Sequence, residues 1–516
     1  MEDMQYYIMG GSNAQNYTRN ILWGLVNKVI SLGMPFVIRT MLIYVLGIQY
    51  VGLDSLFTSV LGILSLAELG VGTAITYFMY APVANNNIVL LSALLNLYRK
   101  IYRRIGLTML IVGLMLLPFI DKLINGTCPS DINLHVLYII FLLNTVLSYF
   151  LYAYKNALFS AYQRNDVRMN IASILNMFRY GIQIIILYLY PNYYLFIVVM
   201  LVNTMANNVV TNYFANKFYP DVKCDGDVSK KLKNDIVHRV KGLVMQKIGG
   251  VVLGSVDGVV ISVFLGLSVL GIYNTYFMII SGLFSLLAVF ELCVPTIGNA
   301  VLIKSVDENY KEYMKINMAY MWVVSWGAVT LYCLYQPFMT LWLGDSDLLL
   351  PNHIIVLLVI YFFVYKWMDV NYFYTEAAGL WYEMRYIPML AAVVNLVINI
   401  ILVQIIGLAG VLISTIVSLL LVYDIGGVWI LFKVYFNRTP VKYLMRQLYY
   451  SVITVLAVMI TSHICEMVQY DGIYGVVLKF SICCIVPNII IMISLSRFDE
   501  FDLVVKFIGG LKKRLG

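Results

Sequence analysis

The sequence predicts an all-α polytopic membrane protein with about 14 transmembrane helices: two parallel-repeat, six-helix lobes around a central cavity, plus two C-terminal helices. Three observations predict it. Of the 516 residues, 61% are hydrophobic and 12% are charged, whereas a soluble domain carries roughly a quarter charged residues. The charges gather between apolar stretches of about 20 residues, the length that crosses a bilayer. Part of the first half of the sequence also recurs in the second half.

The apolar stretches run along almost the whole chain, from Ile21 to Leu495. Most are long enough for one helix through the hydrocarbon core, and the third, which is short, could extend upstream. The expected spans are 21–47, 53–80, 105–120, 134–156, 169–190, 193–215, 242–266, 269–298, 317–338, 352–375, 386–405, 408–432, 446–466 and 473–495. The chain is therefore expected to be embedded in a membrane along most of its length.

Basic and acidic residues alternate from one connecting loop to the next. One set of loops is rich in Lys and Arg, as in Arg99–Arg104, Lys217–Lys241 and Lys433–Arg446. The other set has few basic residues, and its loops carry Asp54, Asp121, Asp131, Asp345, Asp347, Glu466 and Asp471. Because basic loops stay on the cytoplasmic side, an even number of spans and two cytoplasmic termini are predicted. The asymmetry also accounts for the net charge of +8, so no nucleic-acid partner is expected.

Two basic stretches have an apolar side when they are written as helices. They are Leu90–Arg104 and the C-terminal tail, which places Phe501, Val504 and Ile508 on one stripe. Basic residues beside an apolar stripe favour the surface of an anionic leaflet. Both stretches are therefore expected to lie on the inner leaflet, the alternative being a solvated helix packed on the protein.

The first and seventh spans begin two copies of one segment. Asn27–Leu64 aligns without a gap on Gln246–Leu283, which pairs Lys28 with Lys247 and Gly47 with Gly266. Six spans separate the copies, so the two halves have the same orientation, as in parallel-repeat transporters. The predicted parts are an N-lobe at 1–216, a cytoplasmic linker at 217–241, a C-lobe at 242–435, and a C-terminal helix pair with a basic amphipathic tail at 436–516.

Motifs of soluble enzymes are missing from the sequence. The seven cysteines form no CxxC pair, the four histidines are scattered, and no phosphate-binding GxxxxGK[ST] loop is present. Cysteine and histidine spacing therefore predicts no metal site, and no catalytic residue is proposed. The chain is not expected to be an enzyme. A membrane glycosyltransferase remains the alternative from another class.

Several runs of residues resemble one family of membrane proteins. They are Pro35-Phe36-Val37-Ile38-Arg39-Thr40, Tyr50-Val51-Gly52-Leu53-Asp54-Ser55-Leu56-Phe57, Leu66-Ala67-Glu68-Leu69-Gly70, Pro337-Phe338-Met339-Thr340-Leu341-Trp342-Leu343-Gly344 and Glu376-Ala377-Ala378-Gly379-Leu380. In these runs the chain resembles the bacterial polysaccharide and oligosaccharide flippases of O-antigen and capsule type. That family belongs to the multidrug/oligosaccharidyl-lipid/polysaccharide exporter superfamily.

The resemblance implies a function and a location. It implies that the chain moves a polyprenyl-diphosphate-linked oligosaccharide from the cytoplasmic to the outer leaflet of the bacterial inner membrane by alternating access. Membrane lipids, and the polymerase and glycosyltransferases of the same pathway, are the implied partners. A multidrug exporter or a lipid II flippase of the same superfamily is the first alternative. A membrane glycosyltransferase or polymerase is the second.

Basic residues inside the expected spans are candidates for binding the diphosphate. A charge at mid-bilayer costs several kcal/mol, so such residues face a wet cavity or a partner. Guanidinium and ammonium groups bind phosphate oxygens by charge-assisted hydrogen bonds. The candidates are Lys28, Arg39, Arg179, Lys247 and Lys366. The alternative is that they pair with carboxylates and hold helices together, as Lys366 would with Asp369 at i and i+3.

Acidic residues inside the spans are candidates for ion coupling. A buried carboxylate is the usual carrier of a proton or a sodium ion in a transporter. Asp257 is the first candidate because it borders the stripe of the seventh span that includes Lys247. Glu68 and Glu291 follow, with a structural role at a helix end as the alternative. Apart from H⁺ or Na⁺, no cofactor is expected.

Overall fold

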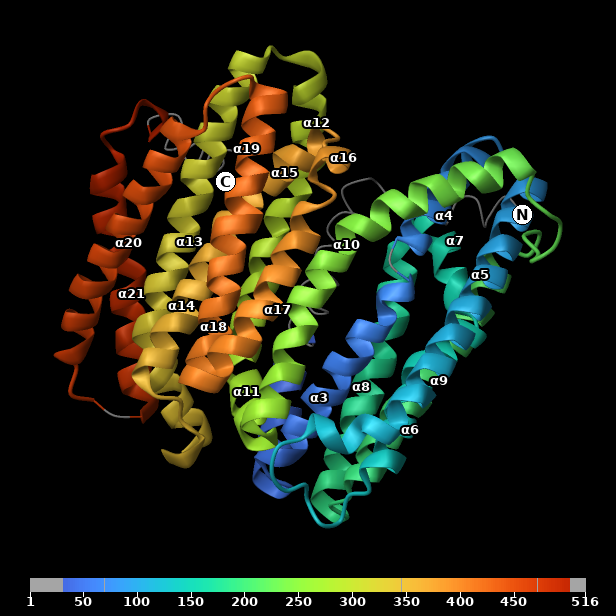
Figure 1. Ribbon diagram of the computed structural model, residues 1–516, viewed down its shortest axis with the longest axis horizontal. Helices are drawn as coiled ribbons and strands as arrows, with labels where there is room; N and C mark the ends of the chain where they lie inside the picture. Colours follow the sequence, from blue (N-terminus) through green and yellow to red (C-terminus); the bar gives the residue numbers. More distant parts are fainter. Residues whose placement is uncertain (1–30, 69, 345, 471, 502–516) are drawn as a thin grey trace, which may run out of the picture. The chain divides into compact units, whose positions relative to one another are not determined.

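The computed structural model describes residues 31–501 apart from 69, 345 and 471, and these residues are almost entirely helical (Figure 1). The chain divides into two compact units, Met1–Val244 and Met245–Gly516. Lys28 and the basic tail beyond residue 501 lie outside the described residues. The finer division into lobes, linker and C-terminal pair stays a prediction.

The first unit is a bundle of long helices connected by short turns. Its elements are the helix Ser31–Val45, α3 (Ile48–Leu64), the 3₁₀ turn Ser65–Glu68, α4 (Val71–Ala84), α5 (Ile88–Leu116), the 3₁₀ turn Leu117–Leu123, α6 (Leu134–Phe150), the 3₁₀ turn Ala153–Lys155, α7 (Asn156–Ala161), α8 (Asn165–Leu189) and α9 (Tyr193–Phe218). Helix α6 packs on both α5 and α9, and α8 packs on α9. The rings of Phe57, Tyr138 and Phe141 fill the contact between α3 and α6. Helix α10 (Lys230–Leu265) then crosses the boundary between the units.

The second unit is built around the long helix α13. Its elements are α11 (Leu267–Leu287), the 3₁₀ turn Ala288–Cys293, α12 (Val294–Ile303), α13 (Val306–Leu343), the 3₁₀ turn Ser346–Leu348, α14 (Asn352–Trp367), α15 (Asp369–Ala377), α16 (Trp381–Met384), α17 (Ile387–Ile406), α18 (Leu408–Val417), the π-helical turn Ser418–Asp424, α19 (Ile425–Ile430), the π-helical turn Leu431–Phe436, α20 (Val441–Glu466) and α21 (Gly472–Leu495). A capping box of Ser305 and Glu308 starts α13 by satisfying free amide groups of the first turn. Helices α14, α20 and α21 pack around α13, and α17 packs on α18 (Figure 1).

The helices confirm the predicted class of an all-α, multi-pass membrane protein. Among the described residues, ten helices are long and apolar enough to cross a membrane, and the bent pair Leu134–Phe150 with Ala153–Ala161 makes up to eleven. Four shorter apolar helices, Ser31–Val45, Ile48–Leu64, Val71–Ala84 and Gly249–Leu265, cover the other expected spans of the described chain. Apolar side chains also stay exposed along single helix faces, and on α8 these are Ile174, Met177, Phe178, Ile182 and Ile185. Such faces suit lipid rather than water.

A matching helix junction supports the internal repeat. Gly47 and Gly266 are aligned in the sequence, and they are the N-caps of α3 and α11. Their φ angles are 111° and 89°, a region that favours glycine because it has no Cβ. The Gly47 amide donates to the Leu42 carbonyl and the Gly266 amide to the Ile261 carbonyl. The repeated glycine therefore marks the same turn between two spans in each unit.

Two assignments of the sequence analysis are wrong. Leu90–Arg104 is not a separate helix on the leaflet, because it forms the first half of α5 and buries Leu91 and Leu94 inside the unit. Part of its polar side also binds protein, since Asn96 donates to the Gly226 carbonyl at 2.8 Å, whereas Arg103 and Arg104 stay exposed. Asp54 does not lie in an outer loop either. It belongs to α3, well inside the helix.

Candidate functional site

Charged residues from three helices gather in the first unit. Arg39 lies in the helix Ser31–Val45, Asp54 in α3 and Arg179 in α8. The Asp54 carboxylate interacts electrostatically with both guanidinium groups. Tyr193 of α9 adjoins Asp54 and Arg39, and its hydroxyl donates to the Tyr50 carbonyl at 3.1 Å. The sequence analysis named both arginines, and Asp54 is the acidic partner that it missed.

The two arginines keep donors free for a further ligand. Arg39 Nη1 and Arg179 Nε are buried nitrogen atoms without a hydrogen-bond partner. The Arg179 guanidinium also lies 4.4 Å from the centre of the Tyr180 ring. A buried donor left unpaired costs about 1–3 kcal/mol, and more for a charged group. A ligand that accepts hydrogen bonds and carries negative charge would recover that cost.

The other three cations predicted to bind the diphosphate do not join this group in the structure as described. Lys28 lies outside the described residues, and Lys247 falls in α10 with its side chain outside the described part. Lys366 is buried in the second unit, where its Nζ lies 2.8 Å from Asp369 Oδ2. It also lies 4.8 Å from the centre of the Phe284 ring. The alternative given for Lys366, an ion pair at i and i+3, is therefore confirmed.

Asp257 occupies a polar site in the second unit. It lies in α10 and is only 7% exposed. Asn399 Nδ2 of α17 donates to its Oδ1 at 2.7 Å, and Thr415 Oγ1 of α18 donates to its Oδ2 at 2.9 Å. Gly249 lets α10 approach α17, because a Cβ at this position would lie 2.2 Å from the Pro388 carbonyl carbon.

Two buried amide oxygens belong to the hydrogen-bond network of the Asp257 carboxylate. Asn395 lies one turn before Asn399 on α17, and its Nδ2 donates to Thr415 Oγ1 at 2.9 Å. The Oδ1 atoms of Asn395 and Asn399 are buried and have no hydrogen-bond partner. Carboxylate, amide and hydroxyl oxygens are the ligands that hard cations prefer. In the sequence, two asparagines at i and i+4 within an apolar span are the pattern that could have indicated this polar site.

Glu68 ends the 3₁₀ turn that breaks the second expected span. The hydroxyls of Tyr102 and Tyr149 donate to its two carboxylate oxygens. Tyr98 in turn donates to Tyr102 at 2.7 Å. Both oxygens of Glu68 are thus engaged by protein groups, which fits the structural alternative given for this residue.

Glu291 lies in a similar 3₁₀ turn, Ala288–Cys293, which breaks the eighth expected span. Glu291 is exposed, and its carboxylate interacts electrostatically with Tyr320 and Tyr365. Glu68 and Glu291 therefore stand at corresponding breaks of the two units.

The family can be assigned from the N-terminal part of the chain. The family described as "Polysaccharide biosynthesis protein" matches residues 17–301, which is more than half of the sequence. The chain belongs to this family. No curated protein matches the sequence. The match covers the first unit with Arg39, Asp54 and Arg179, and it extends through α10 with Asp257.

Solved structures show the fold of this polysaccharide biosynthesis protein. The lipid II flippase MurJ in an inward closed conformation is similar with a TM-score of 0.67 and 15% identity, covering 92% of this chain and 99% of that chain. An inward-facing multidrug resistance MATE family transporter of the MOP superfamily gives a TM-score of 0.61 and 15% identity, covering 78% and 93%. A Vibrio cholerae MATE transporter, VcmN, in a mutant form gives 0.51 and 14%, covering 78% and 92%. The protein therefore has the fold of these membrane transporters.

Proposed function

We propose that this polysaccharide biosynthesis protein is a flippase for polyprenyl-diphosphate-linked oligosaccharide, which it moves from the cytoplasmic to the outer leaflet by alternating access. The family assignment supports a substrate from polysaccharide synthesis. The unpartnered donors of Arg39 and Arg179 are the observation that carries the proposal. They suit the phosphate oxygens of the carrier lipid, which accept charge-assisted hydrogen bonds. In the proposal the protein makes and breaks no covalent bond.

In this proposal, Asp54 balances the charge of the two arginines while no substrate is bound. A carboxylate near two guanidinium groups offsets part of their desolvation while the substrate is absent. An incoming diphosphate carries more negative charge than Asp54 and offers oxygens to the free nitrogens. Binding therefore exchanges one anion for another at the same cations, so that the arginines are never left buried with their full charge unbalanced. Lys28 and Lys247 remain candidates for the same substrate.

We also propose that inward flow of sodium drives the transport, with the ion bound at Asp257. A proton needs only the carboxylate, whereas this site also holds two unpartnered amide oxygens, on Asn395 and Asn399. Several oxygen donors around one carboxylate are what a small hard cation requires. Binding sodium would neutralise the buried charge of Asp257 and change how tightly α10, α17 and α18 pack. Glu68 and Glu291 remain the other candidates for coupling, and a proton the other ion.

A lipid II flippase is the second candidate function, because the fold of MurJ covers 92% of this chain. Lipid II and oligosaccharide carriers share the polyprenyl diphosphate, so the arginines do not separate them. A multidrug exporter fits less well, since cationic drugs favour acidic sites and Arg39 and Arg179 are cationic. A membrane glycosyltransferase or polymerase fits the family and fold least. We place the protein in the bacterial inner membrane with both termini in the cytoplasm, next to the polymerase and glycosyltransferases of its pathway.

A leaflet assay with purified protein in liposomes tests the function. Fluorescent polyprenyl-diphosphate oligosaccharide is added to one leaflet, and an impermeant reagent reports how much has reached the other. Flipping that is faster than in protein-free liposomes, and faster for the oligosaccharide carrier than for lipid II, is expected. Faster movement of lipid II would favour the second candidate. Movement of neither lipid, together with export of a cationic dye, would overturn the proposal.

A further inference from the structure

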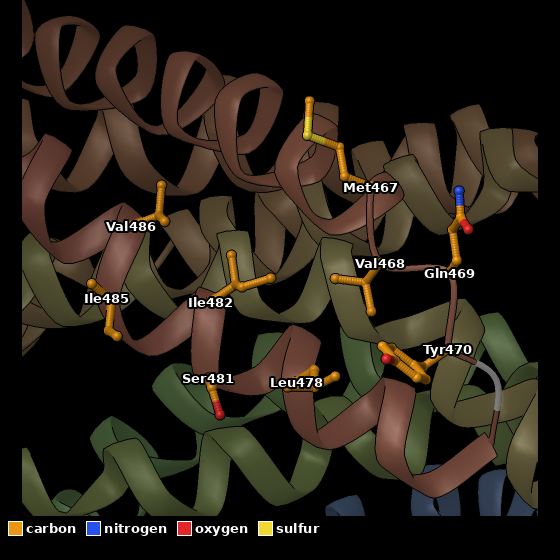
Figure 2. Close-up of a pocket in the computed structure, with 9 residues that line it drawn as sticks. All are labelled: Met467, Val468, Gln469, Tyr470, Leu478, Ser481, Ile482, Ile485 and Val486. Carbon is orange, nitrogen blue, oxygen red and sulfur yellow. The ribbon is translucent and has the colours of Figure 1, made fainter.

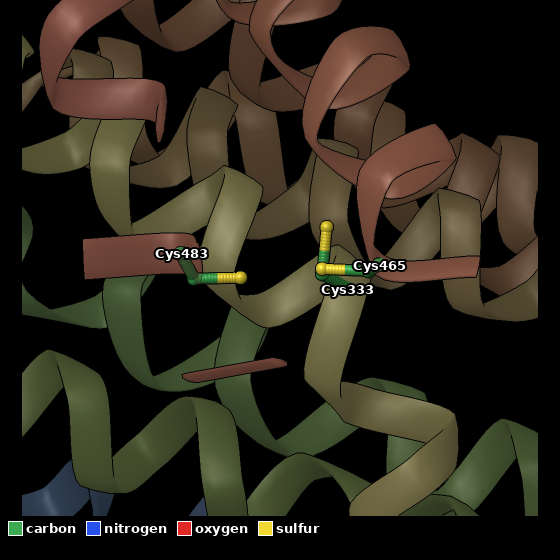
Figure 3. Close-up of side chains that lie close together, drawn as sticks. All are labelled: Cys333, Cys465 and Cys483. Carbon is green, nitrogen blue, oxygen red and sulfur yellow. The ribbon is translucent and has the colours of Figure 1, made fainter. Parts of the chain in front are cut away.

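Three cysteines that are far apart in the sequence meet in the second unit. Cys333 lies in α13, Cys465 in α20 and Cys483 in α21. Their sulfur atoms all lie within 4.8 Å of one another. Figure 3 shows the Cys465 and Cys483 side chains pointing toward one another, with Cys333 beside Cys465. We call this group the cysteine cluster.

The cysteine cluster is closed off from solvent. Cys333, Cys465 and Cys483 are 8%, 4% and 0% exposed, and all three are free thiols. Val329 and Ala457 complete the buried core around them, and Tyr332, Leu334, Val458, Ile482 and Ile490 pack against it. The nearest polar contact is the Lys479 carbonyl, which Cys465 Sγ approaches at 4.0 Å. The Lys479 side chain interacts electrostatically with Cys465, so a positive charge is available beside the sulfurs.

The spacing of the sulfurs suits a metal ion with three sulfur ligands. A metal–sulfur bond of about 2.3 Å places the sulfurs of a planar three-ligand site about 4 Å apart. Small side-chain rotations bring sulfurs within 4.8 Å to that spacing. Zn²⁺ prefers four ligands in a tetrahedron, whereas the His, Cys, Asp and Glu side chains that meet here among the described residues are three cysteines. Thiolates select soft ions such as Cu(I).

We propose that the cysteine cluster binds Cu(I). On binding, thiols lose their protons to solvent as sulfur–copper bonds form, and no electron is transferred. The ion joins α13 to both helices of the C-terminal pair, α20 and α21, and stabilises this contact. The site is independent of the proposed transport, because it uses none of the residues assigned to the lipid or to sodium.

A pocket provides access to the cysteine cluster. It has a volume of about 740 Å³ and is lined by residues 467–470 of the turn between α20 and α21 and by one face of α21 (Figure 2). Ile482 belongs both to the wall of this pocket and to the packing around the cluster. Met467 also lines the pocket, and its thioether is a soft ligand that can hand on Cu(I). Ile482 therefore brings the pocket next to the packing that surrounds the sulfurs.

Copper binding to the purified full-length protein tests the proposal. Cu(I) is titrated under reducing, oxygen-free conditions against a coloured Cu(I) chelator, and X-ray absorption at the copper edge reports the ligands. We expect one ion per chain, with three sulfur ligands at about 2.3 Å. Cys333→Ser, Cys465→Ser and Cys483→Ser should each weaken binding at least about tenfold. Cys484→Ser is the matched control, because it changes the neighbouring residue of α21 outside the cluster.

Two further measurements keep the result interpretable. The thermal midpoint and gel-filtration profile of each variant without copper show whether the fold is intact. Copper should then raise the midpoint of the wild type and of Cys484→Ser, but not that of the cluster variants. Wild-type affinity in folded cluster variants would overturn the proposal. A disulfide between Cys465 and Cys483 in the protein as isolated, detected by mass spectrometry, would also overturn it and assign the cluster to thiol oxidation.

Discussion

Asn399 donates its amide to Asp257 across 2.7 Å, which joins α17 to α10 and leaves Asn399 Oδ1 buried without a partner. The Asn399 side chain donates through its nitrogen, so its oxygen makes no bond to the carboxylate. Asn395 repeats the arrangement one turn away, with its nitrogen on Thr415 and its oxygen free. Both asparagines therefore donate through nitrogen within the hydrogen-bond network of Asp257, and each keeps a buried oxygen without a partner.

The first prediction concerns the charge at this site. Asp257→Asn should abolish stimulation of lipid flipping by an inward sodium gradient, because the amide cannot neutralise a bound cation. Uptake of radioactive sodium and the leaflet assay measure the effect. Asp235→Asn is the matched control, since Asp235 is an exposed aspartate of the same helix α10. Sodium stimulation that persists in folded Asp257→Asn protein would remove this residue from the mechanism.

The second prediction separates sodium from protons. Asn399→Ala removes a free oxygen while it keeps the Asp257 carboxylate. If sodium is the ion, the sodium concentration that gives half-maximal flipping should rise at least about tenfold. The affinity for the lipid should change little. If a proton is the ion, the variant should respond to a pH gradient as the wild type does. A sodium titration at fixed pH, followed by a pH jump without sodium, distinguishes the two results.

The third prediction concerns the arginines of the first unit. Arg39→Gln and Arg179→Gln should each slow flipping at least about tenfold, since each removes a charge-assisted bond worth about 1.5–3 kcal/mol. The apparent affinity for an undecaprenyl diphosphate competitor should fall in parallel. Arg168→Gln, an exposed arginine of the same helix α8, is the matched control. Loss of flipping with unchanged competitor affinity would show that the arginines hold the fold and not the diphosphate.

The fourth prediction concerns the buried ion pair of the second unit. Lys366→Gln should destabilise the protein by about 1–3 kcal/mol, because Asp369, which is 18% exposed, loses its cation. The double variant Lys366→Gln/Asp369→Asn should recover most of this loss and flip lipid at a near wild-type rate. Thermal midpoints in detergent and the leaflet assay measure both. If the double variant is stable but inactive, Lys366 takes part in transport and its ion pair is not its only role.

The fifth prediction tests topology. Ser130→Cys should react with an impermeant maleimide added from outside, whereas Lys230→Cys should react only after the membrane is opened. Native Cys128 should label slowly at neutral pH, because burial, Asp131 and Asp121 raise the pKa of its thiol to about 11. Its labelling should increase as the pH rises towards that value and thiolate forms. All introduced cysteines are placed in a background without native cysteines. Labelling of Lys230→Cys from outside would show that the orientation is the reverse of the predicted one.

Some features followed from the sequence because they depend on neighbours in the chain. Apolar length determines a span, so the expected span 473–495 matches α21 at Gly472–Leu495. The turn at Gly47 and Gly266 could be predicted because a positive φ depends on the residue itself. Lys366 and Asp369 are three residues apart, at the end of α14 and the start of α15, so their pairing depended on local chain geometry.

Other features depended on tertiary packing. The alternation of loop charges assigned Asp54 to an outer loop, and only the approach of α3, α8 and the helix Ser31–Val45 brought it to Arg39 and Arg179. In the sequence, Asn395 and Asn399 are two polar residues of an apolar span. Their partners, Asp257 and Thr415, come from α10 and α18 and become neighbours only when these helices pack against α17. The sequence by itself therefore determined the class, the spans and the local turns of this protein, because hydropathy and backbone preference act over one or two helical turns. Tertiary structure alone decided which side chains share a site, because that depends on which helix faces pack together.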